Sequence, residues 1–393
     1  MHRIILYFLI LILFGCTQKR NLEPIIDATP IFKDAEADRY QIEEPEHPLT
    51  TWQIIDRSLF RYNTDHGRIG FISFKDVAYG NGRFVAVGDA WTGSSSSYSV
   101  IAYSDNGLIW NIVNRKFPLG FYSIAYGNDL FIAIGANSEI VYSYNGEEWF
   151  ADENNFPGTY SITFGNNRFI TWTSEAPEYS DGGERQSIYG VAYSDDGKTW
   201  AIISVSDIFK GAGDANSHTY TNGHFYVALN VHDRNNKIAY STDSVIWNVI
   251  ESENFGQFGV RSIVYGNGRL LVFSCTEIDE YTDGGVNLTY SDDGGITWHL
   301  TEVKNDYENW SWINEITFVN GFFIAVGDNQ KVAYSRDGIT WVSADSNHKF
   351  EYEADDINTF LYFTASAYGN DAHVIVGTNG IMRTSQWSLN NIE

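Results

Sequence analysis

The sequence predicts an all-β protein in which one four-stranded unit is repeated seven times. Aromatic residues make up 16% of the 393 residues and stand beside 35 glycines, a composition typical of strands joined by tight turns. A phrase of the form aromatic-Gly-Asn-x-x-Phe, followed by β-branched and small apolar residues, recurs along the chain. A second phrase follows each copy and is clearest as Ser194-Asp195-Asp196-Gly197-Lys198-Thr199-Trp200.

The first phrase sets the architecture through its spacing. Successive copies begin 38 to 56 residues apart, which suits four strands and is too long for a leucine-rich or ankyrin repeat. The copies begin at Tyr79, Tyr126, Phe164, Tyr220, Tyr265, Phe318 and Tyr368. In the second unit, apolar runs predict strand A at 123–126, strand B at 130–134, strand C at 140–143 and strand D from Trp149. Four-stranded sheets repeated around an axis form a β-propeller, so we expect seven antiparallel blades.

The second phrase predicts the hairpin between strands C and D. Asn-Gly or Asp-Gly supplies the positive φ angles of a primed turn, the preceding Ser and Asp bind free amides of the turn, and Trp begins strand D. Burying such a Trp between blades contributes at most ~4–6 kcal/mol at the usual area coefficient. We assign a structural role in these turns to Asp105, Asp195, Asp293 and Asp337.

The two ends of the repeat region predict how the ring closes. The seventh unit loses the repeat pattern after strand C, and only a weakly matching copy of the second phrase lies around Thr384 to Trp387. The segment from Thr50 to Ile55 contains Trp52 and matches the strand at 247–250 in residue type. The sequence therefore predicts that this N-terminal segment forms the outer strand of the seventh blade, within a propeller spanning residues 49–390.

The first 48 residues predict export and attachment to a membrane. Residues 1–15 contain an apolar run from Ile4 to Phe14, which is shorter than the roughly 20 residues of a membrane-spanning helix and indicates a signal peptide. The end of this run, 13–16, resembles a bacterial lipobox, which implies that Cys16 becomes the lipidated first residue of the mature chain. Residues 16–48 hold four of the seven prolines and an acidic run, as a flexible tether would. The expected location is the bacterial cell envelope, with the membrane leaflet and side left open.

One copy of the second phrase carries a family resemblance. Residues 291–298 match the Asp-box pattern S-x-D-x-G-x-T-W of sialidase-like propellers, while the other copies are one residue shorter and resemble a variant from bacterial repeat proteins. The resemblance covers residues 50–387 and implies structural Asp boxes. It does not extend to sialidase chemistry, because the Phe-Arg-Ile-Pro signature of that family is reduced to Phe60-Arg61-Tyr62-Asn63 and sialidases have six blades.

The candidate ligand site lies on one face of the predicted ring. The A–B and C–D turns are short, so the B–C and D–A connections form the variable face. Aromatic side chains on this face favour a glycan stacked on the rings or a protein ligand. Trp310 and Trp312 have a strand-like spacing that points both the same way. The full set of ligand-binding candidates is Trp91, Tyr179, Tyr281, Trp310 and Trp312.

Composition and motifs together rank the possible functions. The chain has 50 acidic and 25 basic side chains, and its net charge of −25 excludes a general affinity for nucleic acid. The first hypothesis is non-catalytic binding of a protein or glycan. The alternative is a glycoside hydrolase acting on a neutral glycan, with Asp181 and Asp283 as its carboxylate pair, although Asx turns in two acidic loops are the favoured explanation of these residues. A third is a purely structural envelope protein. No cofactor or metal is expected, because the nine histidines show no ligand spacing.

Overall fold

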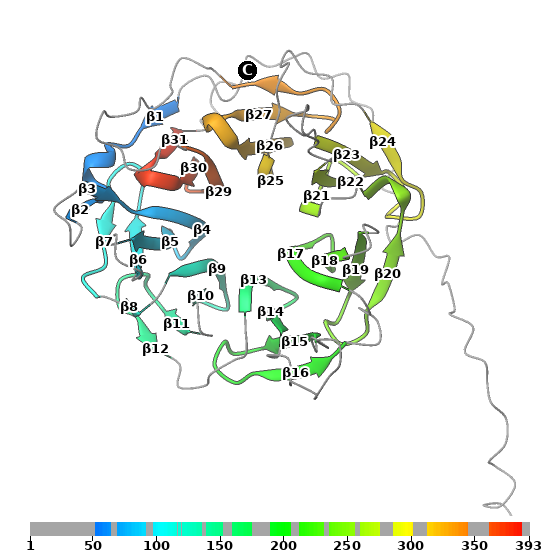
Figure 1. The fold of residues 1–393 in the computed structure, drawn as a ribbon, viewed down its shortest axis with the longest axis horizontal. Coiled ribbons are helices and arrows are strands. Elements are labelled where there is room, and N and C mark those ends of the chain that lie inside the picture. The colour runs from blue at the N-terminus through cyan, green and yellow to red at the C-terminus, as the bar shows by residue number, and fades with distance from the viewer. Residues whose placement is uncertain are drawn as a thin grey trace, which may run out of the picture.

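A computed structural model describes residues 52–386 apart from 64–68, 92–96, 116, 119, 136–138, 152–158, 175–188, 206–211, 232–235, 256–259, 276–285, 302–312 and 345–360. Seven antiparallel sheets stand in a ring around a central axis (Figure 1). Each sheet has four main strands, and its innermost strand runs beside the axis. The predicted seven-bladed β-propeller is therefore confirmed.

The strands fall into four sets from the axis outward. The A strands are β4 (Ser73–Gly80), β9 (Phe121–Gly127), β13 (Thr159–Gly165), β17 (Ala212–Thr221), β21 (Val260–Gly266), β25 (Ile313–Val319) and β29 (Phe363–Gly369). The B strands are β5 (Arg83–Trp91), β10 (Leu130–Gly135), β14 (Arg168–Ser174), β18 (His224–Val231), β22 (Arg269–Cys275), β26 (Phe322–Gly327) and β30 (Ala372–Gly377). We number the blades 1 to 7 in this order.

The outer half of each blade follows the same scheme. The C strands are β6 (Ser97–Ser104), β11 (Ile140–Ser143), β15 (Tyr189–Ser194), β19 (Lys237–Ser241), β23 (Val286–Ser291), β27 (Val332–Ser335) and β31 (Met382–Gln386). The D strands are β7 (Asn111–Ile112), β12 (Phe150–Ala151), β16 (Ala201–Ser204), β20 (Asn248–Glu251), β24 (His299–Thr301), β28 (Val342–Ser343) and β1 (Trp52–Ile54). In blades 1 to 6 the D strand begins one residue after the Trp of the second phrase.

Shorter elements decorate blade 1. The 3-10 helix η1 (Arg57–Phe60) leads into a hairpin of β2 (Arg61–Asn63) and β3 (Ile69–Phe71), and β8 (Phe117–Pro118) pairs with β6. Among the described residues, further 3-10 turns connect strands elsewhere: η3 (Glu253–Phe255), η4 (Asp328–Gln330) and η5 (Thr378–Gly380).

The ring closes through pairing of the two ends of the propeller. Trp52 of β1 lies opposite Ser385 of β31, and the amide of Ile55 donates to the carbonyl of Met382 at 3.1 Å. Trp52 is only 3% exposed and packs among apolar side chains of blades 6 and 7. Figure 1 shows β1, in blue, beside β31, in red. The predicted N-terminal outer strand is confirmed.

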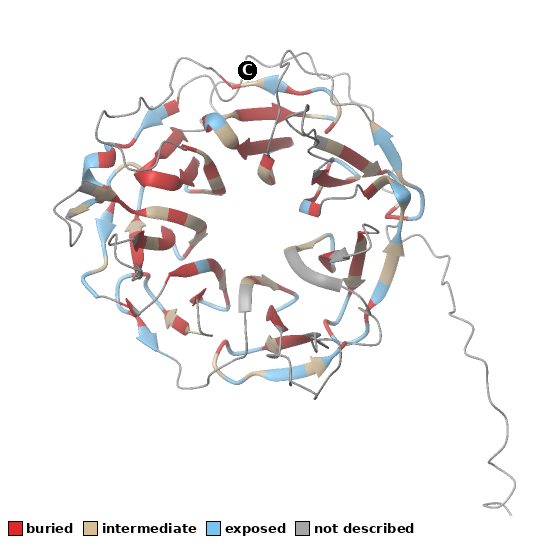
Figure 2. Ribbon diagram, viewed as in Figure 1, coloured by how far each residue is buried: buried red, intermediate tan, exposed pale blue. Residues whose placement is uncertain are grey.

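The hydrophobic core is divided into layers between neighbouring blades (Figure 2). Strand β10 shows why B strands are apolar on both faces. Its residues Phe131 and Ala133 pack against blade 1, whereas Ile132 and Ile134 pack against blade 3. All six residues of β10 are buried. Because successive strand residues point to opposite faces, a sheet covered on both sides needs apolar residues at every position.

The primed turns lie between strands A and B, which corrects the prediction that placed them between strands C and D. Asn81 and Gly82 both have positive φ angles, 48° and 74°, as a type I′ turn requires. In the C–D turn of the same blade, Gly107 has a φ of 73°. This turn is held differently, because the indole N–H of Trp110 donates to the carbonyl of Gly107 at 3.0 Å.

Two of the four proposed turn aspartates bind turn amides. The amide of Thr297 donates to Oδ1 of Asp293 at 2.9 Å, and the amide of Thr340 donates to Oδ1 of Asp337 at 2.7 Å. The same carboxylates accept hydrogen bonds from the Ser that ends strand C. Each side chain thus holds its turn closed at both ends.

The other two aspartates, Asp105 and Asp195, do not bind turn amides, and the prediction is corrected here. The acceptors of turn amides in their blades are the next residues, Asn106 and Asp196. Asp105 and Asp195 instead accept a hydrogen bond at 2.6 Å from the first residue of strand B, an arginine in both blades. In all four turns the acceptor is the second residue after the Ser that ends strand C, so our assignment in these two blades was one residue too early.

Candidate functional site

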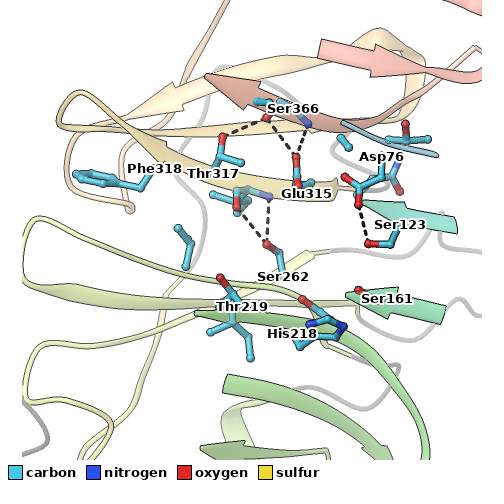
Figure 3. A pocket seen from close by; sticks show the side chains of 18 of the residues that line it. Asp76, Ser123, Ser161, His218, Thr219, Ser262, Glu315, Thr317, Phe318 and Ser366 are labelled. Carbon is cyan, nitrogen blue, oxygen red and sulfur yellow. Dashed lines mark hydrogen bonds between the residues drawn. The ribbon is translucent and has the colours of Figure 1, made fainter. Parts of the chain in front are cut away.

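A cavity of about 850 Å³ occupies the centre of the ring and is lined by all seven A strands (Figure 3). The strands run side by side around it, so the cavity has one end at the A–B and C–D turns and the other at the B–C and D–A connections. We call this cavity the central channel. Its lining is more polar than the layers between the blades, because hydroxyl and carboxyl groups recur on the A strands.

A β-bulge near the start of the A strands orients these polar side chains toward the channel. The register between strands A and B shifts between Phe74 and Asp76 in blade 1, and equivalent shifts occur in the other blades. A bulge leaves one residue unpaired and turns the next side chain away from its regular direction. The register of blade 2 skips Tyr122, which is 38% exposed and lines the channel near the D–A connections.

In blades 1, 2, 5 and 6 the residue after the bulge links the blade to the next one. In blade 2, Oγ of Ser123 accepts a hydrogen bond from the amide of Ile162 in blade 3 at 3.3 Å. In blade 5, Oγ of Ser262 accepts one from the amide of Ile316 in blade 6 at 3.1 Å. These serines satisfy backbone amides that face the channel and would otherwise lack a partner.

Asp76 takes the serine position in blade 1. Its carboxylate accepts hydrogen bonds from the hydroxyl of Ser123 at 2.7 Å, the amide of Ile124 at 2.9 Å and the amide of Val77 at 2.7 Å (Figure 3). Desolvation raises the pKa of Asp76 to about 6, and the three hydrogen bonds oppose that rise. Oδ2 therefore holds blades 1 and 2 together, while Oδ1 is engaged by the amide of Val77 within blade 1.

Glu315 takes the same position in blade 6. Its Oε2 accepts hydrogen bonds from the amide of Ser366 at 2.6 Å and from the hydroxyl of Ser366 at 3.2 Å, and that hydroxyl lies 3.1 Å from Oγ1 of Thr317. Desolvation, followed by the charge of Asp76, raises the pKa of Glu315 to about 8. The Glu315 carboxyl is thus largely protonated at neutral pH.

His218 is the third titratable group of the channel. It stands in β17 where the equivalent positions of other A strands hold apolar residues such as Ile124 and Ile162. Its ring nitrogens are shielded from solvent, and burial lowers the pKa of His218 to about 4. The described residues contain no group of three or more His, Cys, Asp or Glu side chains arranged to hold a metal ion.

This arrangement favours binding over chemistry. Two carboxyl groups in one cavity are the minimum for glycoside hydrolysis. Asp76 and Glu315, however, each accept backbone hydrogen bonds from the next blade, as the serines of other blades do. The rest of the polar lining includes hydroxyl groups together with Lys75, Arg261 and Asn314, and such groups suit the recognition of a polar ligand.

The structure describes one of the residues that sequence reasoning proposed for the site. Trp91 ends β5 and pairs with Ser97, on the side of the B–C connection. The remaining candidates, and the proposed lipidation site, lie outside the described residues: Cys16, Tyr179, Asp181, Tyr281, Asp283, Trp310 and Trp312.

The channel carboxyls were missed because the A strands were compared only by their aromatic-Gly-Asn ends. Aligning the whole strands shows Ser123 and Ser262 at the position that Asp76 and Glu315 occupy. A carboxyl residue at a position where other blades have serine is the sequence signal that identifies them.

The fold and its channel define a seven-bladed β-propeller, and comparisons with known proteins support that class. No protein-family model and no curated protein matches the chain. Among solved structures, YCF48 bound to D1 peptide is similar at 12% identity and a TM-score of 0.55, over 87% of this chain and 99% of that chain. YCF48 from Cyanidioschyzon merolae is similar at 13% identity and a TM-score of 0.55, over 85% and 98%.

A third similar structure is PorZ of Porphyromonas gingivalis, described as an essential bacterial surface component of the type-IX secretion system. It shares 12% identity with a TM-score of 0.53, over 83% of this chain and 47% of PorZ. At these identities the likeness establishes the fold alone. No helix among the described residues is long and apolar enough to cross a membrane.

Proposed function

We propose that the protein is a non-catalytic binding propeller, held at a bacterial envelope membrane through Cys16. Its ligand, a segment of a protein or a glycan, binds on the face of the B–C and D–A connections at the end of the central channel. The observation that carries this proposal is the polar channel of about 850 Å³, whose two carboxyl groups are engaged in bonds between blades.

A protein segment is the preferred ligand. Backbone edges of the A strands and polar side chains surround the channel, and an extended segment can exchange hydrogen bonds with such groups. Tyr122 offers an exposed aromatic ring at the proposed end of the channel. Nearby, the ammonium group of Lys75 lies 3.3 Å from a carboxylate oxygen of Asp89, so the positive charge of Lys75 is balanced by that carboxylate. YCF48, which is similar in fold, has been solved with a bound peptide.

Peptide and glycan arrays probed with the full-length protein test the proposal. We expect saturable binding to a subset of peptides or glycans. Tyr122→Ala should weaken the strongest interaction by about tenfold, as the loss of an aromatic anchor does. Tyr144→Ala is the matched control, because Tyr144 is 51% exposed in a C–D turn on the opposite face. Absence of saturable binding on both arrays, or an equal effect of the two substitutions, would contradict the proposal.

A glycoside hydrolase remains the second candidate, favoured by one observation. Asp76 and Glu315 lie in the same channel with pKa values raised to about 6 and about 8, and a general acid needs such a raised pKa. Hydrolysis of neutral aryl glycosides that is lost in both Asp76→Asn and Glu315→Gln would support it. Activity lost in the Asp181→Asn, Asp283→Asn double variant alone would move the catalytic pair to the loops.

A further inference from the structure

The interface between blades 6 and 7, here called the 6–7 seam, departs from the pattern that holds other blades together. In five blades, the glycine of the first phrase lies against the aromatic ring of the next blade: Gly80 against Tyr126, Gly127 against Phe164, Gly165 against Tyr220, Gly266 against Phe318 and Gly369 against Tyr79. Blades 4 and 6 have Thr221 and Val319 at this position, so the same close approach is not possible between blades 4 and 5 or, at the 6–7 seam, between Val319 and Tyr368.

A hydrogen bond is also missing from the 6–7 seam. In five blades, the amide nitrogen of the turn asparagine donates to a backbone carbonyl in a C–D turn of the next blade: Asn81 to Tyr144, Asn128 to Asp195, Asn166 to Thr242, Asn267 to Arg336 and Asn370 to Asp105. Within the described part of the chain, neither Asn222 of blade 4 nor Asn320 of blade 6 makes such a bond, and only the blade 6 position lies at the seam that also holds the closing strand. The innermost strands β25 and β29 also lie in looser contact than other neighbouring A strands.

The closing strand adds a row of buried polar atoms to the 6–7 seam. Trp52, Ser385 and His373 lie side by side on β1, β31 and β30, and they are 3%, 1% and 0% exposed. The indole nitrogen of Trp52, the hydroxyl of Ser385 and both ring nitrogens of His373 find no hydrogen-bond partner among the described residues. In blade 1, by contrast, the equivalent indole donates to a carbonyl of its Asp box. In blade 7 the Trp comes from the N-terminal strand β1. It is therefore not preceded by a C–D turn whose carbonyl its indole could bind.

His373 interrupts the repeat. Five other blades have phenylalanine at its position, namely Phe84, Phe131, Phe169, Phe225 and Phe323, and blade 5 has Leu270. The ring of His373 lies 5.8 Å from the ring of Trp52, between centroids. Only a neutral imidazole fits this dry position, and burial lowers the pKa of His373 to about 3.

The groups around His373 do not offer it a carboxylate on its own sheet. Strand β1 carries no titratable side chain, β29 contributes Tyr368 and β31 contributes Arg383. Blade 6 contributes Tyr334, Arg336 and, nearer the axis, Glu315, whose carboxyl is engaged with Ser366. A proton on His373 would therefore be stabilised only after the imidazole reaches water.

We propose that release of β1 from β31 withdraws Trp52 and so opens the outer part of the 6–7 seam, and that protonation of His373 drives this opening in acid. The closed ring excludes the proton, whereas the open ring exposes the imidazole and accepts it. Because the pKa is lower in the closed form, opening becomes more favourable as pH falls below about 6.5 and continues to do so down to about 3. Between pH 8 and pH 4.5 the opening equilibrium should rise on the order of fifty- to hundredfold.

Hydrogen–deuterium exchange of the full-length protein, followed by mass spectrometry and corrected for the intrinsic effect of pH, tests the proposal. We expect β1 and β31 to lose protection between pH 8 and pH 4.5, while the strands of blade 2 keep theirs. His373→Phe, which restores the residue of the other blades, should abolish this acid-dependent loss. His373→Leu, which introduces the residue that blade 5 has as Leu270, provides a second variant if the first does not fold.

His218→Ile is the matched control, since it removes another histidine that interrupts the repeat and has both ring nitrogens shielded from solvent, on a blade without a closing strand. We expect it to leave the acid-dependent loss in β1 and β31 unchanged. The proposal fails if His373→Phe keeps the acid dependence of the wild type. It also fails if all seven blades lose protection together in the wild type, because the opening would then be global unfolding.

Discussion

The ring of Tyr126 lies where a β-carbon of Gly80 would be, with Cγ only 2.0 Å from that position. The glycine of the first phrase is thus required by the close approach of the next blade, and the aromatic residue of the same phrase supplies the approaching ring. One short motif therefore encodes both halves of a contact between blades. The contact recurs around the ring, since Gly369 of blade 7 meets Tyr79 of blade 1.

Gly80→Ala should destabilise the propeller by ~1–3 kcal/mol, the usual cost of forcing extra volume into a packed interface. Denaturant unfolding of the full-length protein measures this change. Thr221→Ala is the control, because blade 4 already has a β-carbon at the equivalent position and should change by less. Equal losses of unfolding free energy in the two variants would show that the contact between Gly80 and Tyr126 is not sterically restrictive.

Asp196→Ala and Asp195→Ala should differ although the residues are neighbours. Asp196 accepts the amides of Lys198 and Thr199, so its loss should cost ~1–2 kcal/mol. Asp195 forms an exposed ion pair with Arg168, worth ~0–1 kcal/mol. The amide of Thr199 is the main cause that lowers the pKa of Asp196 to about 2, so the contribution of Asp196 is present above pH 4 and is lost as pH falls toward 2. A larger loss in Asp195→Ala would reverse our assignment of the turn acceptor.

Glu315→Gln should stabilise the protein at alkaline pH. The pKa of Glu315 is raised in the folded state, so its contribution favours folding below pH 4.5 and is lost as pH rises through about 8. Glutamine can still accept the amide of Ser366 without taking up charge. We expect the unfolding free energy of the variant, relative to that of the wild type, to rise by ~1–3 kcal/mol between pH 5 and pH 9, measured by urea unfolding. Glu251→Gln, at an exposed pair with Lys237, should show no comparable trend; a gap that does not widen with pH would contradict the raised pKa.

Deleting residues 49–56 should greatly lower the unfolding temperature, because the deletion removes the strand that pairs with β31. Trp52→Ala is a milder version and should cost ~3–5 kcal/mol, as the loss of a buried Trp does. Calorimetry of both variants measures the effect. Replacing 49–56 with a Gly-Ser segment of equal length controls for chain length and should behave like the deletion; an unfolding temperature equal to that of the wild type would disprove a role in closure.

Cys16→Ala should abolish lipid attachment and release the protein from the membrane fraction. Metabolic labelling with an alkyne-bearing fatty acid, followed by fractionation of a bacterial expression host, measures both properties. Cys275→Ala is the control and should leave labelling unchanged. Label retained in Cys16→Ala would assign the lipid to another residue or exclude lipidation at Cys16.

Repetition made much of the fold predictable from sequence. The expected A strand at 123–126 lies within β9, and β11 spans 140–143 as predicted. The turn types were less predictable, because Asn-Gly and Asp-Gly occur in both hairpins and only the side-chain acceptors distinguish them. Asp76, Glu315 and His373 escaped notice because each is a single exchange within a strand, and its meaning depends on which blade lies beside it.

The pairing of Trp52 with Ser385 also has a consequence for the order of synthesis. The first propeller strand to leave the ribosome belongs to the last blade, so it stays without its partner until nearly the whole chain has been translated. At ~5–20 residues per second, that interval lasts on the order of tens of seconds. During this interval, the uncovered face of blade 6 and the indole of Trp52, which is not yet packed in the core, are surfaces that a chaperone can bind.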